Sequence, residues 1–65
     1  MGASLYPDLV KILLAYQCSF VRQGKGSHEI WQSPITHRKF PVATTIVSKN
    51  TANAILKQAG IEERL

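Results

Sequence analysis

Apolar residues recur every three or four positions near the start of the chain. This spacing predicts one face of an amphipathic helix over about residues 5–16. Pro7 fits the first turn of that helix, where its missing N–H would have no intrahelical partner. The apolar positions that share the spacing are Leu5, Leu9, Ile12, Leu13 and Tyr16.

The pattern then changes to alternation over residues 18–23, 28–32 and 39–45, which is typical of β-strands with one buried face. In the first of these segments, strict alternation puts Phe20 and Arg22 on the same face. In the second, His28, Ile30 and Gln32 share one face and Glu29 and Trp31 the other, and the pattern does not say which face is buried.

The connections between these strands have recognisable turn chemistry. Residues 33–38, with Pro34, predict a hairpin connection. Pro41 cannot donate a ladder hydrogen bond and indicates an edge strand or a bulge. Residues 42–47 either extend the third strand or form a loop after it.

A second helix is predicted over about residues 51–59. Ser48 or Asn50 can cap its N-terminus, Gly60 can end it in the left-handed conformation, and Ile61 can fold back as a hydrophobic contact. Its apolar positions fall on one face and are Ala52, Ile55, Leu56 and Ala59.

The predicted order is therefore α-β-β-β-α, in a single domain over residues 1–65. Three strands with short connections form an antiparallel meander, and two helices with one apolar stripe each cover one of its faces. This is an α+β fold with the topology of a double-stranded-RNA-binding domain. The uncovered face is the natural place for polar function.

Composition supports a small folded protein of the cytoplasm. Of the 65 residues, 45% are hydrophobic, which favours a core over disorder. Cys18 is the only cysteine, so no intrachain disulfide forms, and a lone thiol suits a reducing compartment. Neither a membrane span nor a signal peptide is recognisable.

The positive charge of the chain is concentrated in its middle. The net charge is +4, and residues 22–57 contain six Lys or Arg residues and a single acid, Glu29. A basic segment of this kind favours a polyanionic partner such as RNA.

Residues 22–28, with the sequence RQGKGSH, combine flexible backbone, positive charge and a titratable side chain. The two glycines allow positive φ angles and leave backbone amides able to face an anion. His28 is the candidate for proton transfer, because histidine is the side-chain type whose unperturbed pKa, about 6.5, lies near neutrality. The residues expected to bind RNA or phosphate are Arg22, Lys25, Gly26, Ser27, Lys39 and Lys49.

These residues suit RNA cleavage, because RNA carries its own nucleophile, the 2′-OH. A base must remove the 2′ proton, and positive groups must stabilise the added charge on phosphorus. His28 is the candidate base. The chain lacks the acidic cluster of a two-metal nuclease, so we expect neither a metal nor another cofactor.

The motif RQGKGSH, followed by Glu29-Ile30-Trp31 and later by residues 51–60 (TANAILKQAG), resembles the HicA toxins of type II toxin–antitoxin systems. The resemblance implies a ribosome-independent mRNA ribonuclease with a double-stranded-RNA-binding-domain-like fold. It also implies that the catalytic histidine of the glycine-serine-histidine triplet corresponds to His28, and that the partner is a HicB antitoxin. This chain differs from the shorter RQKGSH form by one residue, Gly24, which lengthens the loop.

Other readings stay open from the sequence alone. The same fold can serve as a non-catalytic RNA-binding module, or its basic face can dock an acidic protein. We expect His37 to be a solvated turn residue, Trp31 a packing residue and Cys18 a small core residue. Asn53 either is solvated or hydrogen-bonds a neighbouring segment.

Overall fold

The structure, a computed structural model, describes residues 4–65. It confirms the predicted α-β-β-β-α order. The third strand ends at Ala43, two residues earlier than predicted, and residues 44–48 form a loop. The second helix begins two residues earlier than predicted. The elements are α1 (Tyr6–Ala15), β1 (Ser19–Gln23), β2 (His28–Gln32), β3 (Lys39–Ala43) and α2 (Lys49–Gln58).

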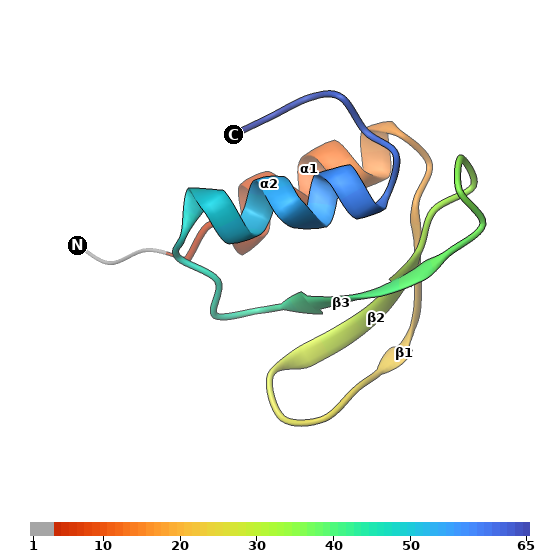
Figure 1. Cartoon of the computed structure of the whole chain (residues 1–65). Helices are drawn as coiled ribbons and strands as arrows, with labels where there is room; N and C mark the ends of the chain where they lie inside the picture. The colour runs from red at the N-terminus through yellow and green to blue at the C-terminus, as the bar shows by residue number, and fades with distance from the viewer. Residues whose placement is uncertain (1–3) are drawn as a thin grey trace.

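The three strands form one antiparallel sheet in the order β1-β2-β3. Both helices lie over the same face of this sheet, as expected for the α+β architecture (Figure 1). Pro41 belongs to β3, which is an edge strand, so the ladder hydrogen bond that proline cannot donate is not needed on its outer side. The other face of the sheet is left without a covering layer.

The core lies between the helices and the covered face of the sheet. Trp31, Phe40 and Val42 are buried on that face, together with Leu9 of α1 and Leu56 of α2. Since Trp31 is 4% exposed, the Glu29 and Trp31 side of β2 faces the helices. His28, Ile30 and Gln32 therefore lie on the uncovered face, which resolves the ambiguity of the sequence pattern.

A β-bulge interrupts the pairing of β1 with β2. Phe20 pairs with Trp31 and Arg22 pairs with Ile30, so Val21 is an extra residue on β1. The prediction that Phe20 and Arg22 share a face is therefore wrong. Paired residues of antiparallel strands point to the same side, so Arg22 lies on the uncovered face with Ile30.

The ends of α2 follow their sequence signals. Ser48 Oγ accepts a hydrogen bond from the Thr51 amide at 3.4 Å. At the other end, Gly60 has a φ of +77°, its amide donates to Lys57 O, and the Ile61 amide donates to Leu56 O. These two bonds make a Schellman motif, and Ile61 is buried as predicted. No helix within residues 4–65 is long and apolar enough to cross a membrane.

Candidate functional site

The uncovered face of the sheet is basic. Arg22 and Lys39 lie on it, and Lys25 is in the loop at its edge, whereas Glu29 faces the helices. Among the described residues, no Asp or Glu shares this face. We call it the open face, and the strand residues that form it are Ser19, Arg22, His28, Ile30, Gln32, Lys39, Pro41 and Ala43.

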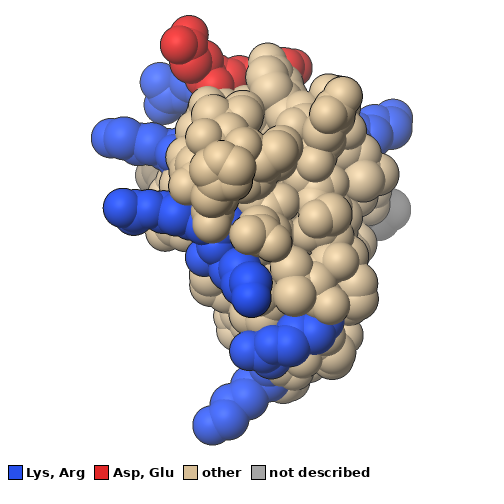
Figure 2. Space-filling model, turned by 90° about the vertical axis from the view of Figure 1, so that its right-hand side faces the viewer, with Lys and Arg blue, Asp and Glu red and all other residues tan. Residues whose placement is uncertain are grey.

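The charge distribution on the face drawn in Figure 2 agrees with this assignment. Figure 2 shows Lys and Arg side chains along one side and the lower end of the molecule, and acidic side chains at the upper end. The two views share their vertical axis. In Figure 1 the sheet and the β1–β2 loop lie at the lower end, and the helices and the C-terminal segment lie at the upper end. A polyanion is therefore attracted to the sheet end.

His28 is the first residue of β2 and is exposed on the open face. Its Nδ1 lies 3.3 Å from Lys25 O. A carbonyl can only accept, so this contact favours the tautomer with the proton on Nδ1, in which Nε2 carries the lone pair.

Hydrogen bonds within the β1–β2 loop fix the backbone that carries His28. The Gly24 amide donates to His28 O at 2.9 Å, and the His28 amide donates to Lys25 O at 3.0 Å. Gln23 Nε2 donates to Gly26 O at 3.2 Å and to His28 O at 2.9 Å. Gln23 thus clamps both sides of the loop, a role that the sequence analysis did not assign to it.

Only one of the two loop glycines has the predicted left-handed conformation. Gly26 has a φ of +57°, and nothing lies within 4 Å of the place where a Cβ would be. Gly24 has no positive φ, and its amide is used by His28 O, so the expectation that it faces an anion is wrong. A Cβ on Gly24 would meet His28 O at 3.2 Å and Ile30 Cδ1 at 3.4 Å.

Three consecutive amides remain to bind an anion. Among the described residues, the N–H groups of Lys25, Gly26 and Ser27 find no hydrogen-bond acceptor. Adjacent backbone amides around a left-handed residue form an anion-binding concavity, to which the Lys25 ammonium adds charge. Three unpaired amides and a lysine therefore lie in the loop that leads into His28.

Arg22 belongs to the same end of the sheet. It pairs with Ile30 and lies diagonally from His28, a relation that separates side chains by roughly 7 to 8 Å. Arg22 Nη1 donates to Gln23 O at 3.4 Å, and the guanidinium is exposed. The bulge at Val21 creates this arrangement, because an unbulged β1 would have put Arg22 on the helix side.

The predicted set of residues is only partly brought together. Lys39 is on the open face but pairs with Gln32, four residues along β2 from His28 and hence roughly 13 Å away. Lys49 begins α2, in the helical layer. The compact group is Arg22, Lys25, Gly26, Ser27 and His28.

A hydrogen-bonded group on the other side of β2 anchors the residues next to His28. Tyr6 Oη donates to Glu29 Oε1 at 2.6 Å, and Trp31 Nε1 donates to the same oxygen at 3.1 Å. The hydrogen bond to Glu29, then burial, then the charge of Glu29 raise the pKa of Tyr6 to about 12. Trp31 is therefore a packing residue, as predicted, and is absent from the open face.

Two further expectations are confirmed. Cys18 is buried, and this burial raises the pKa of its thiol, an effect that the Ser33 hydroxyl partly offsets. His37 is exposed in the β2–β3 loop. Within residues 4–65, no group of three His, Cys, Asp or Glu side chains is placed to hold a metal ion.

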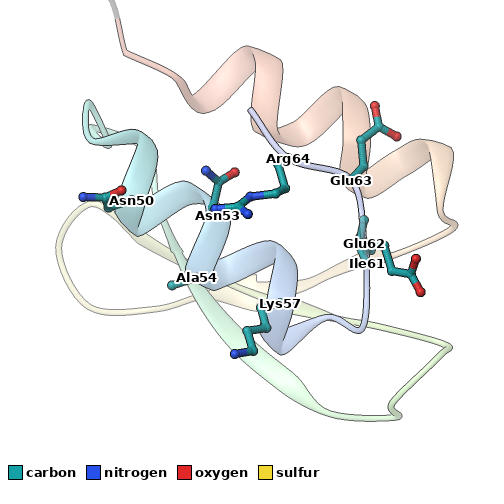
Figure 3. A pocket seen from close by; sticks show the side chains of 8 residues that line it. All are labelled: Asn50, Asn53, Ala54, Lys57, Ile61, Glu62, Glu63 and Arg64. Carbon is teal, nitrogen blue, oxygen red and sulfur yellow. The ribbon is translucent and has the colours of Figure 1, made fainter.

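A further hollow lies away from His28. It is a groove of about 520 Å³ between α2 and the C-terminal segment, and Figure 3 shows the side chains that project around it. Asn53 Oδ1 accepts a hydrogen bond from the Leu65 amide at 2.8 Å, which settles the open question about Asn53. Lys57 and Arg64 line the groove together with Glu62 and Glu63, so its charges largely cancel.

One comparison with known proteins gives a match. A family model described as "HicA toxin of bacterial toxin-antitoxin" matches residues 6–61, from the first residue of α1 to the residue after Gly60. No curated protein and no solved structure matches the chain.

Proposed function

This chain belongs to the HicA toxin family of bacterial toxin–antitoxin systems, and we propose that it is an endoribonuclease that cuts mRNA through His28. The reaction needs neither a metal ion nor the ribosome. The observation that carries the proposal is the position of His28. It is exposed on the basic open face, next to three unused amides and diagonal to Arg22.

The proposed reaction uses the 2′-OH of the substrate as nucleophile. His28 Nε2 takes the 2′ proton, the 2′ oxygen attacks phosphorus, and the bond from phosphorus to the 5′ oxygen breaks. The leaving 5′ oxygen takes a proton from solvent water. The products are a 2′,3′-cyclic phosphate and a 5′-OH end.

Charge develops on the phosphoryl oxygens as the 2′ oxygen attacks. The Lys25, Gly26 and Ser27 amides and the Lys25 ammonium stabilise that charge, in the manner of an oxyanion hole. Arg22 binds the phosphate from the other side of His28. Lys39 and Lys49 extend the contact to neighbouring phosphates, on the open face and at α2 respectively.

Membership of a toxin–antitoxin family implies an antitoxin partner. We propose that this partner is a HicB-type protein that covers the open face in the cytoplasm and so denies mRNA access to His28. Val21, the bulge residue of the edge strand β1, adds exposed apolar surface at the edge of the sheet. Burying such surface also stabilises a domain of this size by mass action.

The test is RNA cleavage by purified wild-type protein and by the His28→Ala variant. Removing a general base costs roughly 10²- to 10⁴-fold in rate, and an exposed strand residue contributes little to folding. Lys11→Ala is the matched control, since Lys11 is exposed on α1 in the helical layer. Equal melting temperatures and normal cleavage by the control are expected. Cleavage by His28→Ala within a few-fold of wild type would refute the role of His28.

Expression in cells distinguishes the main alternative, a non-catalytic RNA-binding module with the same basic face. A nuclease toxin arrests growth with cleaved mRNA, the His28→Ala variant does not, and a co-expressed antitoxin restores growth. A binding module leaves mRNA intact in all three cultures, while the purified protein still binds RNA with a strong salt dependence.

A further inference from the structure

A second polar hollow lies at the opposite end of the sheet from His28. It has a volume of about 270 Å³. It sits where β2 runs into the β2–β3 loop, whereas His28 follows the β1–β2 loop at the other end (Figure 1). The residues that line it are Gln17, Ser19, Gln32, Ser33, Pro34 and His37.

Two residues of this lining have left-handed backbones although they are not glycines. Gln17 has a φ of +65° and His37 a φ of +59°. A non-glycine residue in this conformation costs about 1 kcal/mol or more, and such residues cluster at binding sites. Gln17 follows the C-cap of α1, and its left-handed backbone terminates that helix: its amide donates to Leu14 O and the Cys18 amide to Leu13 O. The His37 amide donates to Ser33 O. Local backbone bonds thus hold both polar residues at the rim of one hollow.

The floor of the hollow is continuous with the open face. Ser19 pairs with Gln32, and Gln32 pairs with Lys39, so these three residues form a cross-strand row. The row lies four residues along β2 from His28, roughly 13 Å away. Ile30 and Pro41 lie between, with no acid on the path, so a polyanionic strand can run from His28 to this row.

The lining carries the groups that bind an unstacked nucleobase. The Gln17 amide offers a donor and an acceptor, which is the pattern that pairs with adenine N6 and N7. Gln32 Nε2 donates to His37 O at 3.4 Å, which leaves its second N–H and its oxygen for a base. The His37 imidazole and the Pro34 ring offer flat or apolar surface for stacking. Lys39, next to Gln32 in register, supplies the positive charge for the phosphate of the same nucleotide.

We propose that this hollow is a nucleotide subsite, which binds a base of the RNA strand a few nucleotides from the bond cut at His28. The inference rests on the proposed ribonuclease function, and it assigns the sequence preference of the enzyme to the β2–β3 end of the sheet. An adenine is the preferred base.

The first test is a length series of single-stranded RNA substrates, cut by wild type and by the His37→Asn and Gln32→Met variants. Asparagine tolerates the left-handed conformation at residue 37, and methionine preserves the length of Gln32. We expect KM for long substrates to rise about tenfold, which is the order of one base-stacking contact, while kcat stays unchanged. A dinucleotide does not reach the hollow, so its cleavage stays at the wild-type rate. Equal losses on short and long substrates, or no loss on long ones, would overturn the proposal.

A second arm locates the bound base and does not depend on catalysis. Binding of a 2′-O-methyl oligonucleotide, which cannot be cut, is measured by fluorescence anisotropy while each base in turn is removed to an abasic site. One position should weaken wild-type binding about tenfold and leave His37→Asn binding unchanged. Gln58→Met, on the exposed part of α2, is the matched control and should follow wild type. If no position separates wild type from His37→Asn, the subsite is absent. If binding behaves as expected but the long RNA is not cut, the proposed nuclease function fails and the subsite stands.

Discussion

The two hairpin loops of the sheet are held in place by different kinds of contact. The β1–β2 loop is exposed and is held by its own hydrogen bonds, with Gln23 as the clamp. The β2–β3 loop is attached to α2, because the buried Ser33 Oγ donates to Ala59 O at 2.6 Å. The first loop presents groups to solvent and the second joins the sheet to the helices. The proposed catalytic group and the attachment of the sheet to α2 thus lie at different ends of one small sheet.

Two glycines with similar backbone conformations show the same contrast. Gly26 has open space around the position of a Cβ. At Gly60 a Cβ would lie 2.8 Å from Thr36 Cγ2 and 3.0 Å from Ile35 Cγ2. The left-handed φ is common to both, so the difference between them is packing against the β2–β3 loop.

Substitution of these glycines by alanine gives the largest expected difference. Gly26→Ala should cost about 1 kcal/mol, from backbone strain alone. Gly60→Ala adds a clash that forces the loop away from α2, and should cost about 2 to 3 kcal/mol. In a domain this small that lowers the melting temperature by roughly 10 °C or more. Thermal unfolding followed by circular dichroism compares the melting temperatures of the two variants. Equal decreases would mean that the contact of a Cβ at residue 60 with Thr36 does not destabilise the fold.

Two side-chain hydrogen-bond donors sharpen the comparison. Ser33→Ala leaves the buried Ala59 carbonyl and the Ile35 amide without their partner, and should cost about 1 to 3 kcal/mol. Gln23→Ala removes two bonds in an exposed loop, where water replaces them, and should cost less than about 0.5 kcal/mol. For RNA cleavage we expect the opposite order: Gln23→Ala should lose more activity than Ser33→Ala, because Gln23 holds the backbone of His28. A Gln23→Ala variant with full activity would show that the loop keeps its shape unaided.

The fold followed closely from local sequence signals. Gly60 and Ile61 mark the end of α2, Pro41 marks an edge strand, and the change of period separates helices from strands. These signals act within a few residues, so the sequence displays them directly. His28 was equally visible, because its glycine loop precedes it in the chain.

The features that could not be predicted from the sequence depend on contacts between segments, such as the pairing between strands. The bulge at Val21 is a property of the register of β1 against β2, and alternation within β1 alone gives the wrong face for Arg22. The clamp by Gln23 needs the folded loop. The left-handed backbones of Gln17 and His37 could not be predicted, because neither residue is a glycine. Each is decided by contacts made after the chain has folded.

The smallest expected effect concerns Tyr6, whose hydroxyl contacts Glu29 on the side of β2 that faces the helices. The pKa of Tyr6 rises from the ordinary 10.0 to about 12, mainly because its hydroxyl donates to Glu29. The folded state therefore holds this proton more tightly than the unfolded state does. The contribution is fully present below pH 10 and is lost as the pH rises towards 12.

Tyr6→Phe tests this contribution without touching the open face. At neutral pH the variant should lose about 1 kcal/mol, since Trp31 Nε1 still donates to Glu29. Between pH 10 and 12 the gap between wild type and variant should close, as seen in urea unfolding at each pH. Tyr16→Phe is the comparison variant, because Tyr16 is exposed after α1 and its hydroxyl contacts Glu63 at 3.3 Å. Burial and then Glu63 raise the pKa of Tyr16 too, so its variant should show a smaller gap that closes in the same direction. A gap that stays constant up to pH 12 would show that the Tyr6 proton is not linked to folding. RNA cleavage at pH 7 should be the same in all three proteins, because the hydroxyl of Tyr6 acts on the covered side of β2 and the chemistry takes place on the other.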